Sequence, residues 1–565
     1  MFSPSAKTQL FIKDALLIGV MAMLAGCGLV YEYLLSHYAG RVLGAFESAV
    51  FTMIGLMIVS MGVGAFAARS IKDPYKGFIW LEIIIAVLGS SSVLIIAAMI
   101  GWTYTLPQIL ADTFGIPPDA IPMGGWMGKL NQLSMKLPYV AGVALGLFIG
   151  MEIPLIARVR ERLYGEHLDH NAGTIYGADY IGAGVGAAIW VGLLMSMEIS
   201  SAAAWTASVN ALAGLIFLFL FWKHIKYRRI LLVLHFGLFA LIVSLGLQGK
   251  TWLQSFTDAL YKDDVVYQQQ TRYQQLVFTE RKLGPEIKPV YHFYLNGRLQ
   301  FSSQDEFIYH EMLVHPAMAG SARKDNVLVI GGGDGLAVRE ILKWQPKHIT
   351  LVDLDPDLIT LFKQPETRLP ARLANDINHL TQGALADPRV NIIFEDAFIT
   401  VDSLLKQHKT YDAIIVDLPD PNHPDLNKLY SRHFYLRLNQ LLSADGMLAI
   451  QSTSPYHAKK AFLAIGKTVK ASEFKYVSQY HQNVPSFGEW GWTLASKLQS
   501  PQDKLKQITM PEQTEWITPE LLQAAFVFPH DYYQEIEQIK VNDLGSHVLY
   551  KYHYQAWRQQ IGTAF

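Results

Sequence analysis

Cysteine and charge are both scarce in this chain of 565 residues. The single cysteine, Cys27, lies inside an apolar run, so one chain can form neither a disulfide nor a cysteine-ligated metal site. It therefore gives no information about the redox compartment. Charged residues make up only 17% of the chain and the net charge is −1, which gives no reason to expect nucleic acid or an anionic surface as the main partner.

Hydrophobic residues, 51% of the total, gather in long runs that fill the chain up to about Gln248. A single run could be a buried core helix of a soluble protein, but several long runs in succession indicate membrane spans. The candidate spans are residues 14–36, 44–68, 78–104, 136–157, 173–197, 201–222 and 230–248. We therefore predict a multi-pass α-helical membrane domain of about seven helices over residues 1–249.

Acidic residues occur within the predicted spans, at Glu32, Glu47, Glu82, Glu152 and Asp179. Acids at membrane depth are costly, and they usually line a cavity or pair internally. They could mark a cation site or path, but interfacial placement or hydrogen bonding between helices is the interpretation that we favour slightly. The small residues of Gly182–Ala187 fit tight helix packing.

A loop of the same half contains His167, Asp169 and His170. These side chains can bind metals, but their spacing is poor for a metal site and a hydrated loop is the better interpretation. We predict no metal site.

Two stretches with alternating polar and apolar residues open the soluble half, Gln270–Thr279 and Val290–Phe301. The second contains Asn296–Gly297, a strong signal for a two-residue hairpin turn. We predict a small β-hairpin subdomain over residues 250–305.

Short apolar runs that alternate with helical patterns then indicate a doubly wound α/β sheet. The predicted strands are residues 326–330, 348–352, 390–394, 413–416 and 447–450. The first strand runs into Gly331–Gly335 and a helix near 337–343. We therefore predict a Rossmann-like domain of the S-adenosyl-methyltransferase type over 306–500, followed by a C-terminal extension over 501–565.

Acids follow the first four strands, at Asp334, Asp353, Asp396 and Asp417. In an open α/β sheet, ligands bind beyond the carboxyl ends of the strands, so these carboxylates should surround one crevice. Asp353 can accept hydrogen bonds from both ribose hydroxyls, and Asp396 can accept from an adenine amino group. The pattern indicates an adenosyl cofactor such as an S-adenosyl compound.

Asp420 adds a further acid beside Asp417. Such a cluster would repel the methionyl carboxylate of S-adenosylmethionine, and it suits a cofactor without that carboxylate together with a cationic amine substrate. A carboxylate can also remove the proton of the attacking amine as a general base. Aromatic side chains could contribute cation–π contacts, namely Tyr309, Phe487, Trp490 and Trp492.

Several ordered motifs carry a resemblance to a known family. They are Asp305–Met312 with His315–Pro316, Val327–Gly335 with Arg339–Glu340, Asp417–Pro421, Leu429–Tyr435 and Val484–Gly488 with Gly491–Trp492. In order and spacing they resemble the polyamine aminopropyltransferases of the spermidine synthase family. The match covers roughly Tyr267 to Leu498, and the membrane half resembles that of a membrane-fused bacterial branch.

The resemblance implies transfer of an aminopropyl group from decarboxylated S-adenosylmethionine, as co-substrate, to putrescine, giving spermidine and methylthioadenosine. It implies Asp417 as the base, assisted by Tyr309. Asp420 would hold the diamine, with Phe487 and Trp490 nearby. The residues implied on the cofactor side are Gln274, Gln300, His310, Gly331, Gly333, Asp334, Asp353, Asp396 and Ala397. His310 and His315 are better interpreted as structural than as catalytic.

The chain departs from the family pattern at three places. Leu336 stands where a second glycine is usual, Asn422–Pro424 replaces Gly-Pro, and Phe487 replaces a common tyrosine. The last two changes lie at the amine end, so the acceptor is left open. Two alternatives remain: an S-adenosylmethionine-dependent transferase acting on another amine, and a polyamine transporter with a sensing or processing domain.

Basic residues follow the second, fourth and sixth spans, which predicts that these three loops are cytoplasmic. An odd number of spans would then place the catalytic domain outside, whereas the cofactor and putrescine are made in the cytosol. We expect an inner-membrane protein with its catalytic domain in the cytoplasm. The expected partners are a polyamine substrate, the lipid bilayer and a second copy of the chain, with no nucleic acid.

Overall fold

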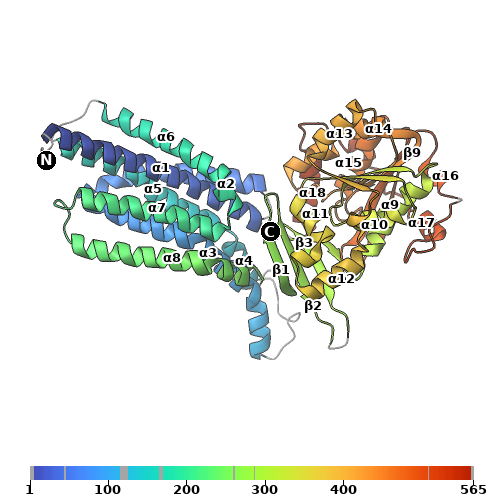
Figure 1. Cartoon of the computed structure of the whole chain (residues 1–565), viewed down its shortest axis with the longest axis horizontal. Helices are drawn as coiled ribbons and strands as arrows, with labels where there is room; N and C mark the ends of the chain where they lie inside the picture. Colours follow the sequence, from blue (N-terminus) through green and yellow to red (C-terminus); the bar gives the residue numbers. More distant parts are fainter. Residues whose placement is uncertain are drawn as a thin grey trace. The chain divides into compact units, whose positions relative to one another are not determined.

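The computed structural model describes residues 6–43, 46–114, 125–164, 170–258, 261–284, 287–506 and 508–560. The chain divides into two compact units, Met1–Lys262 and Asp263–Phe565 (Figure 1). The first unit therefore extends beyond the boundary expected at residue 249. The side chain of Glu47 and the residues His167 and Asp169 lie outside the described part of the chain.

The first unit is helical throughout its described part. Its helices are α1 (Ala6–Leu43), α2 (Phe46–Ala67), α3 (Pro74–Phe114), α4 (Gly125–Ser134), α5 (Leu137–Tyr164), α6 (Asn171–Gly192), α7 (Ile199–Leu220) and α8 (Arg228–Asp258). Seven of them are long and apolar enough to cross a membrane, as predicted from the sequence. The corresponding segments are Thr8–Gly40, Ala49–Ser70, Pro74–Thr103, Gln132–Tyr164, Asn171–Ser196, Ile199–Leu220 and Arg228–Leu253.

Small residues let α1 and α6 approach closely (Figure 1). A Cβ atom added at Gly182 would lie 1.9 Å from the carbonyl oxygen of Ala22, and one at Gly186 would lie 2.4 Å from that of Gly26. Neither contact is sterically allowed, so both positions require glycine for this packing. The glycine-rich segment predicted to pack tightly therefore does so against the first helix.

The second unit opens with a four-stranded antiparallel sheet in the order β1-β2-β3-β4. The strands are β1 (Asp264–Gln270), β2 (Gln275–Arg281), β3 (Val290–Leu295) and β4 (Arg298–Ser302). Asn296 and Gly297 both have positive φ, 51° and 77°, as a type I′ hairpin turn requires. The hairpin predicted at this dipeptide is therefore present.

A seven-stranded sheet follows, in the order β10-β11-β9-β8-β5-β6-β7. Its strands are β5 (Asn326–Gly331), β6 (His348–Asp353), β7 (Val390–Phe394), β8 (Tyr411–Asp417), β9 (Leu442–Gln451), β10 (Tyr476–Val484) and β11 (Gly488–Ser496). The first five are parallel, and β11 and β10 pair antiparallel beyond β9. Strand order reverses between β5 and β8, which makes their carboxyl ends the topological switch point.

Both faces of this sheet are covered by helices (Figure 1). They are α9 (Glu306–Gly320), α10 (Leu336–Leu342), α11 (Pro356–Lys363), α12 (Ala371–Thr381), α13 (Ala397–Lys406), α14 (Arg432–Leu441) and α15 (Lys459–Lys470). Along β5, Val327 and Val329 belong to the core with α9 to α12, whereas Leu328 and Ile330 belong to the core with α13 to α15. This alternation explains why the strand is apolar at each position from Val327 to Ile330.

The C-terminal extension packs on the catalytic unit through α16 (Pro501–Lys504), α17 (Pro519–Ala524) and α18 (Val548–Gln560). The buried carboxylate of Glu311 accepts hydrogen bonds from the backbone N–H groups of Glu515, Trp516 and Ile517, at 2.6, 2.9 and 2.8 Å. Leu549 of α18 is fully buried. The extension is therefore part of the folded unit.

Candidate active site

The glycine turn after β5 is locked against the end of β8. Gly331 has φ +77°, and a Cβ atom there would lie 2.1 Å from the backbone oxygen of Asp417. The N–H of Gly332, which also has positive φ, donates to that same oxygen at 3.0 Å. Only glycine allows this approach without strain, and it sets the turn beside the Asp417 side chain.

Asp417 is the centre of a cluster from three elements. The Tyr309 hydroxyl of α9 donates to Asp417 Oδ1 at 2.7 Å. Ligand atoms of His310, Asp334 and Asp417 all lie within 4.8 Å of one another. The two aspartates are half-buried and His310 is buried. The structure therefore brings together the residues predicted as base and assisting tyrosine with two of the residues predicted to contact the cofactor.

Charge in this cluster is set by burial and by one cation. Burial raises the pKa of Asp417 to about 6, and the neighbouring Asp334 adds to the rise while His310 and Tyr309 oppose it. Burial also raises the pKa of Asp334. Burial alone would lower the pKa of His310, but Glu306 outweighs it and raises that pKa to about 9. At neutral pH the cluster thus holds a cationic imidazole between two carboxyl groups.

Glu306 and Arg339 hold the side chain of His310 in the cluster. His310 Nδ1 lies 2.8 Å from Glu306 Oε2, and Arg339 donates to both oxygens of Glu306 at 2.6 and 3.0 Å. All three residues are buried. The ion pair keeps Glu306 ionised, so the pKa of Glu306 is lowered although burial opposes this. Glu306 and Arg339 belong to the family motifs, but their role as a support under His310 was not predicted.

His315 is also structural in its contacts, as the sequence suggested. Its Nε2 lies 2.9 Å from Glu340 Oε2, and its Nδ1 lies 2.9 Å from the indole nitrogen of Trp344. Together with Glu311 and Glu340 it forms a second, fully buried group of potential metal ligands. Glu311 already binds three backbone N–H groups of the extension, which gives that carboxylate a structural function.

Asp353, predicted to bind the ribose, ends β6 and accepts from the N–H of Asp355 at 2.9 Å. Burial raises the pKa of Asp353 to about 7, with a further rise from Asp355 and Asp334. A Cβ atom at Gly333 would lie 2.7 Å from Asp353 Oδ2, so the glycine leaves room for that carboxylate. Gln274 donates to Asp355 Oδ2 at 3.0 Å and so reaches the same loop from the small sheet.

Asp396 caps α13 by accepting from the N–H of Phe398 at 2.9 Å, and Ala397 is the first residue of that helix. The other carboxylate oxygen of Asp396 forms an ion pair with Lys428, a partner that the sequence did not predict. The Gln300 amide donates to backbone oxygens of Arg298 and Leu299 in its own strand. Neither bond joins Gln300 to the Asp417 cluster.

Asp420 contacts a different set of residues from those around Asp417. Gln451 donates to its Oδ1 at 3.0 Å, and Thr453 donates to its Oδ2 at 3.3 Å. His553 of α18 places Nε2 3.1 Å from Asp420 Oδ2, and the indole N–H of Trp557 lies 3.0 Å from the same Nε2. The C-terminal extension thus reaches the residue predicted to hold the diamine, which no motif had indicated.

The predicted aromatic residues lie around Tyr309. Ring centroids are 6.1 Å apart for Tyr309 and Phe487, 5.7 Å for Tyr309 and Trp492, and 5.1 Å for Phe487 and Trp490. The Trp490 indole N–H is buried with no hydrogen-bond partner. These rings join the Asp417 cluster to a hydrophobic wall that comes from β11 and the loop before it.

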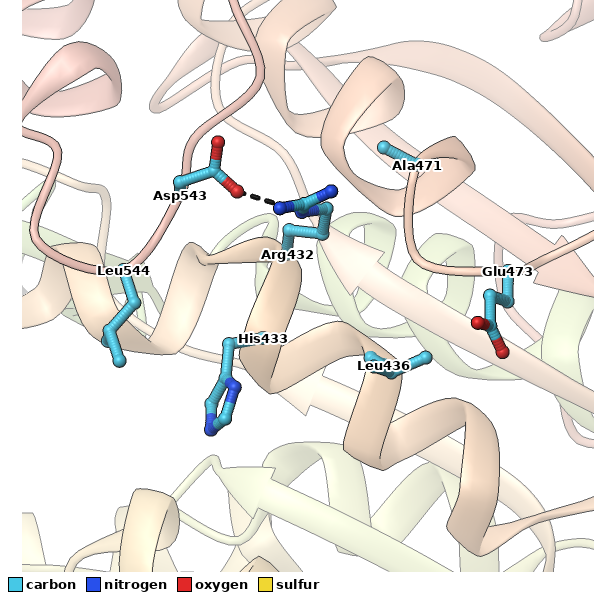
Figure 2. Close-up of a pocket in the computed structure, with 7 residues that line it drawn as sticks. All are labelled: Arg432, His433, Leu436, Ala471, Glu473, Asp543 and Leu544. Atoms are coloured by element: carbon cyan, nitrogen blue, oxygen red, sulfur yellow. Dashed lines mark ion pairs between the residues drawn. The ribbon is translucent and has the colours of Figure 1, made fainter.

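Two other features lie apart from this site. His423, for which no role was predicted, caps the 3-10 helix Pro424–Tyr430 by accepting from the Asp425 N–H at 3.2 Å. Figure 2 shows a pocket of about 510 Å³ where an Arg432–Asp543 ion pair of 2.8 Å joins α14 to the extension. Its lining residues are Arg432, His433, Leu436, Ala471, Glu473, Asp543 and Leu544, and none of them is a predicted site residue.

A Rossmann-like sheet with a glycine turn, an acid at the end of its second parallel strand and a buried acid cluster at its switch point defines an adenosyl-cofactor transferase. A family model described as the spermine/spermidine synthase domain matches residues 306–507. The polyamine aminopropyltransferase of Shewanella oneidensis is 56% identical over 98% of this chain and 96% of its own. Polyamine aminopropyltransferase 1 of Streptomyces coelicolor is 32% identical over 96% of this chain and 94% of its own.

Among solved structures, spermidine synthase in complex with the transition-state analogue AdoDATO covers 48% of this chain and 88% of its own, with 25% identity and a TM-score of 0.41. The full-length relatives decide the family. The chain belongs to the polyamine aminopropyltransferases, and it is an enzyme of aminopropyl transfer. These relatives support aminopropyl transfer over the two alternatives left open by the sequence.

Proposed function

We propose that the aminopropyl donor is decarboxylated S-adenosylmethionine and that the acceptor is a diamine such as putrescine, giving spermidine and methylthioadenosine. The observation that carries this proposal is the acid cluster of Asp334 and Asp417, in which His310 is the cation. An intact methionyl carboxylate about 4 Å from one ionised aspartate would be disfavoured by about 4 kcal/mol at an effective dielectric constant of 20. An aminopropyl ammonium group would gain a similar attraction.

Asp417 acts as the general base in this proposal. The acceptor nitrogen forms a bond to the aminopropyl carbon next to sulfur, and the carbon–sulfur bond breaks with its electron pair moving to the sulfonium. The sulfur leaves as a neutral thioether, so neither an acid nor a metal ion is needed for the leaving group. The proton of the attacking amine passes to Asp417, whose carboxylate Tyr309 orients through the 2.7 Å hydrogen bond.

The cofactor side is proposed from the strand ends. Asp353 would accept from the ribose hydroxyls, while Asp396 and the start of α13 at Ala397 would face the adenine. Asp334 would hold the aminopropyl ammonium, and Gly331 and Gly333 would allow close approach of the turn. Gln274 is linked to this region through Asp355, and Gln300 is assigned here on the family pattern alone.

The amine end is proposed around Asp420. Its carboxylate would hold the distal ammonium of the diamine, with Phe487 and Trp490 providing apolar and cation–π contact. The His553 side chain of α18 lies on the same carboxylate. His553 would act together with the residues that depart from the family pattern, Asn422–Pro424 and Phe487. These residues would determine how long an acceptor amine the site binds.

The seven long apolar helices support a multi-pass location in the inner membrane. We also propose that the catalytic unit faces the cytoplasm, where its cofactor and diamine are made, and that the chain forms a homodimer. The membrane unit would then hold the enzyme at the bilayer.

Product analysis tests the reaction. Purified full-length protein is incubated with intact or decarboxylated S-adenosylmethionine and a panel of amines, and the products are identified by mass spectrometry. We expect spermidine and methylthioadenosine only with the decarboxylated cofactor and putrescine. Calorimetry should also give tighter binding of the decarboxylated form; tighter binding of the intact form would refute the charge argument.

A further inference from the structure

A buried polar cluster lies inside the helical unit, far in sequence from the catalytic motifs. The side chains of Glu82 on α3, Asn210 on α7 and His235 on α8 are at most 1% exposed. Asn210 Nδ2 donates to Glu82 Oε2 at 2.9 Å. His235 Nδ1 lies 2.8 Å from the Leu231 carbonyl oxygen and must donate to it, which leaves Nε2 of a neutral imidazole as an acceptor.

Each of these side chains has a second polar atom that has no hydrogen-bond partner among the residues that the structure describes. These atoms are Glu82 Oε1, Asn210 Oδ1 and His235 Nε2. Asn210 Oδ1 and His235 Nε2 are acceptors, given the bonds already made by the other end of each side chain, and Glu82 Oε1 is an acceptor when the carboxyl group is ionised. Buried polar atoms are nearly always paired in folded proteins, so three unpaired acceptors together call for a donor.

The packing brings these atoms toward one place. A Cβ atom added at Gly214, one helical turn after Asn210, would lie 2.9 Å from His235 Nε2 and 3.1 Å from Glu82 Cβ. The absent side chain at Gly214 therefore lets α8 and α3 bring the imidazole of His235 and the side chain of Glu82 near each other. Tyr31, fully buried on α1, also has an unpartnered hydroxyl and lies within electrostatic range of Glu82.

A second acid makes the charge balance of the cluster unfavourable without a cation. Glu152 on α5 is 2% exposed and interacts electrostatically with Glu82. Within the described part of the chain, no lysine or arginine forms an ion pair with either glutamate. Two carboxylates that share a buried site cannot both ionise unless a positive charge lies between or beside them.

The three unpaired acceptor atoms indicate which kind of cation would bind there. A protonated primary amine has three N–H donors, which matches the three unpaired acceptors. Alkali and alkaline-earth ions prefer shells made of oxygen ligands, and an imidazole nitrogen is a poor member of such a shell. We propose that Glu82, Asn210 and His235 form a binding site for the ammonium group of a polyamine within the helical bundle. The choice of a polyamine rests on the amine chemistry proposed for the catalytic site, whereas the ammonium site does not.

The test measures equilibrium binding of radiolabelled putrescine to full-length protein in lipid nanodiscs. To remove the catalytic amine site, all proteins carry Asp417→Asn and Asp420→Asn. We expect this background to retain one saturable site per chain, and Glu82→Gln to weaken it more than tenfold. Glu32→Gln, which removes a half-buried acid from α1, is the matched control and should bind as the background does.

His235→Phe removes the unpartnered Nε2 acceptor and serves if Glu82→Gln does not fold. It should weaken binding about fivefold, the effect of one hydrogen bond. Absence of saturable binding in the background, or binding insensitive to both substitutions, would overturn the proposal and leave a protonated glutamate in the cluster. Displacement of putrescine by equimolar sodium or potassium would also overturn it. Spermidine formation by the wild type is measured separately, so failure of the proposed reaction would be distinct.

Discussion

Asp417 and Asp353 are both aspartates at the end of a parallel strand, but their neighbours differ. Asp417 accepts a hydrogen bond from Tyr309 and lies with a cationic His310. Asp353 receives a backbone N–H from Asp355 and lies against the glycine turn. The first environment suits proton transfer and the second suits binding of hydroxyl groups, so substitutions at the two positions should affect different kinetic constants.

Asp417→Asn should reduce kcat by roughly 10²–10⁴-fold while binding of decarboxylated S-adenosylmethionine survives, because the base is lost but the adenosine contacts remain. Asp353→Ala should chiefly weaken cofactor binding. Steady-state kinetics with calorimetry on each variant measures both effects. Wild-type turnover in Asp417→Asn would remove that residue from the proposed role.

The pH dependence of the reaction follows from the raised pKa of Asp417. A base with a pKa of about 6 is protonated below that pH, so kcat/KM for the acceptor should fall as pH drops through 6. Asp334 raises this pKa and His310 lowers it. Asp334→Asn should therefore move the acidic limb to lower pH, and His310→Gln should move it to higher pH. A limb that stays at one pH in both variants would belong to another group.

At the scale of elements, the five parallel strands of the catalytic unit were predicted because their pattern is local, whereas β10 and β11 were not predicted. β5, β6 and β8 are short, largely apolar runs that end at a glycine or an aspartate, β7 is followed by Glu395, and the Asn296–Gly297 turn needs only its two residues. The glycine turn and Asp417 were predicted to lie together because β5 and β8 end at the same edge.

Contacts between distant segments were not predictable in the same way. Lys428 pairs with Asp396, and His553 reaches Asp420 across 133 positions of sequence. Neither Lys428 nor His553 lies in a recognisable motif. Nothing in a single sequence determines where an extension of short helices will pack. The same holds for the polar cluster in the helical unit. The sequence places Glu82 and Glu152 within predicted spans, but only the packing of the helices brings His235 and Asn210 beside Glu82.

The position of α18 leads to a prediction about acceptor choice. His553→Ala removes the side chain beside Asp420 Oδ2 but leaves the hydrogen bonds from Gln451 and Thr453. We expect the preference for putrescine over longer amines, measured as the ratio of kcat/KM values, to fall by about tenfold, with cofactor affinity unchanged. His547→Ala, at an exposed position just before α18, is the control. An unchanged ratio would mean that α18 only stabilises the fold.

At the scale of the whole molecule, the charge of the loops and the supply of substrate point to opposite sides of the membrane. The last long helix of the first unit is α8, and its segment Arg228–Leu253 is apolar enough to cross a membrane. If all seven helices cross and the basic loops are cytoplasmic, the catalytic unit lies outside. We expect the catalytic unit inside, with its cofactor, which requires that α8 does not cross or that the loop rule is broken.

Two cysteines that flank α8 separate these arrangements. Lys226 precedes the helix and Asp264 follows it, and both side chains are exposed, whereas the native Cys27 is buried. Lys226→Cys and Asp264→Cys, made singly, are treated on intact cells with a membrane-impermeant thiol reagent, with permeabilised cells as the positive control and the parent protein as the negative one. We expect Asp264→Cys to react only after permeabilisation. If Lys226→Cys behaves in the same way, α8 does not cross; if it reacts on intact cells, α8 crosses and the basic loop lies outside. Labelling of Asp264→Cys on intact cells would place the catalytic unit outside, where its cationic substrate would need a route through the membrane.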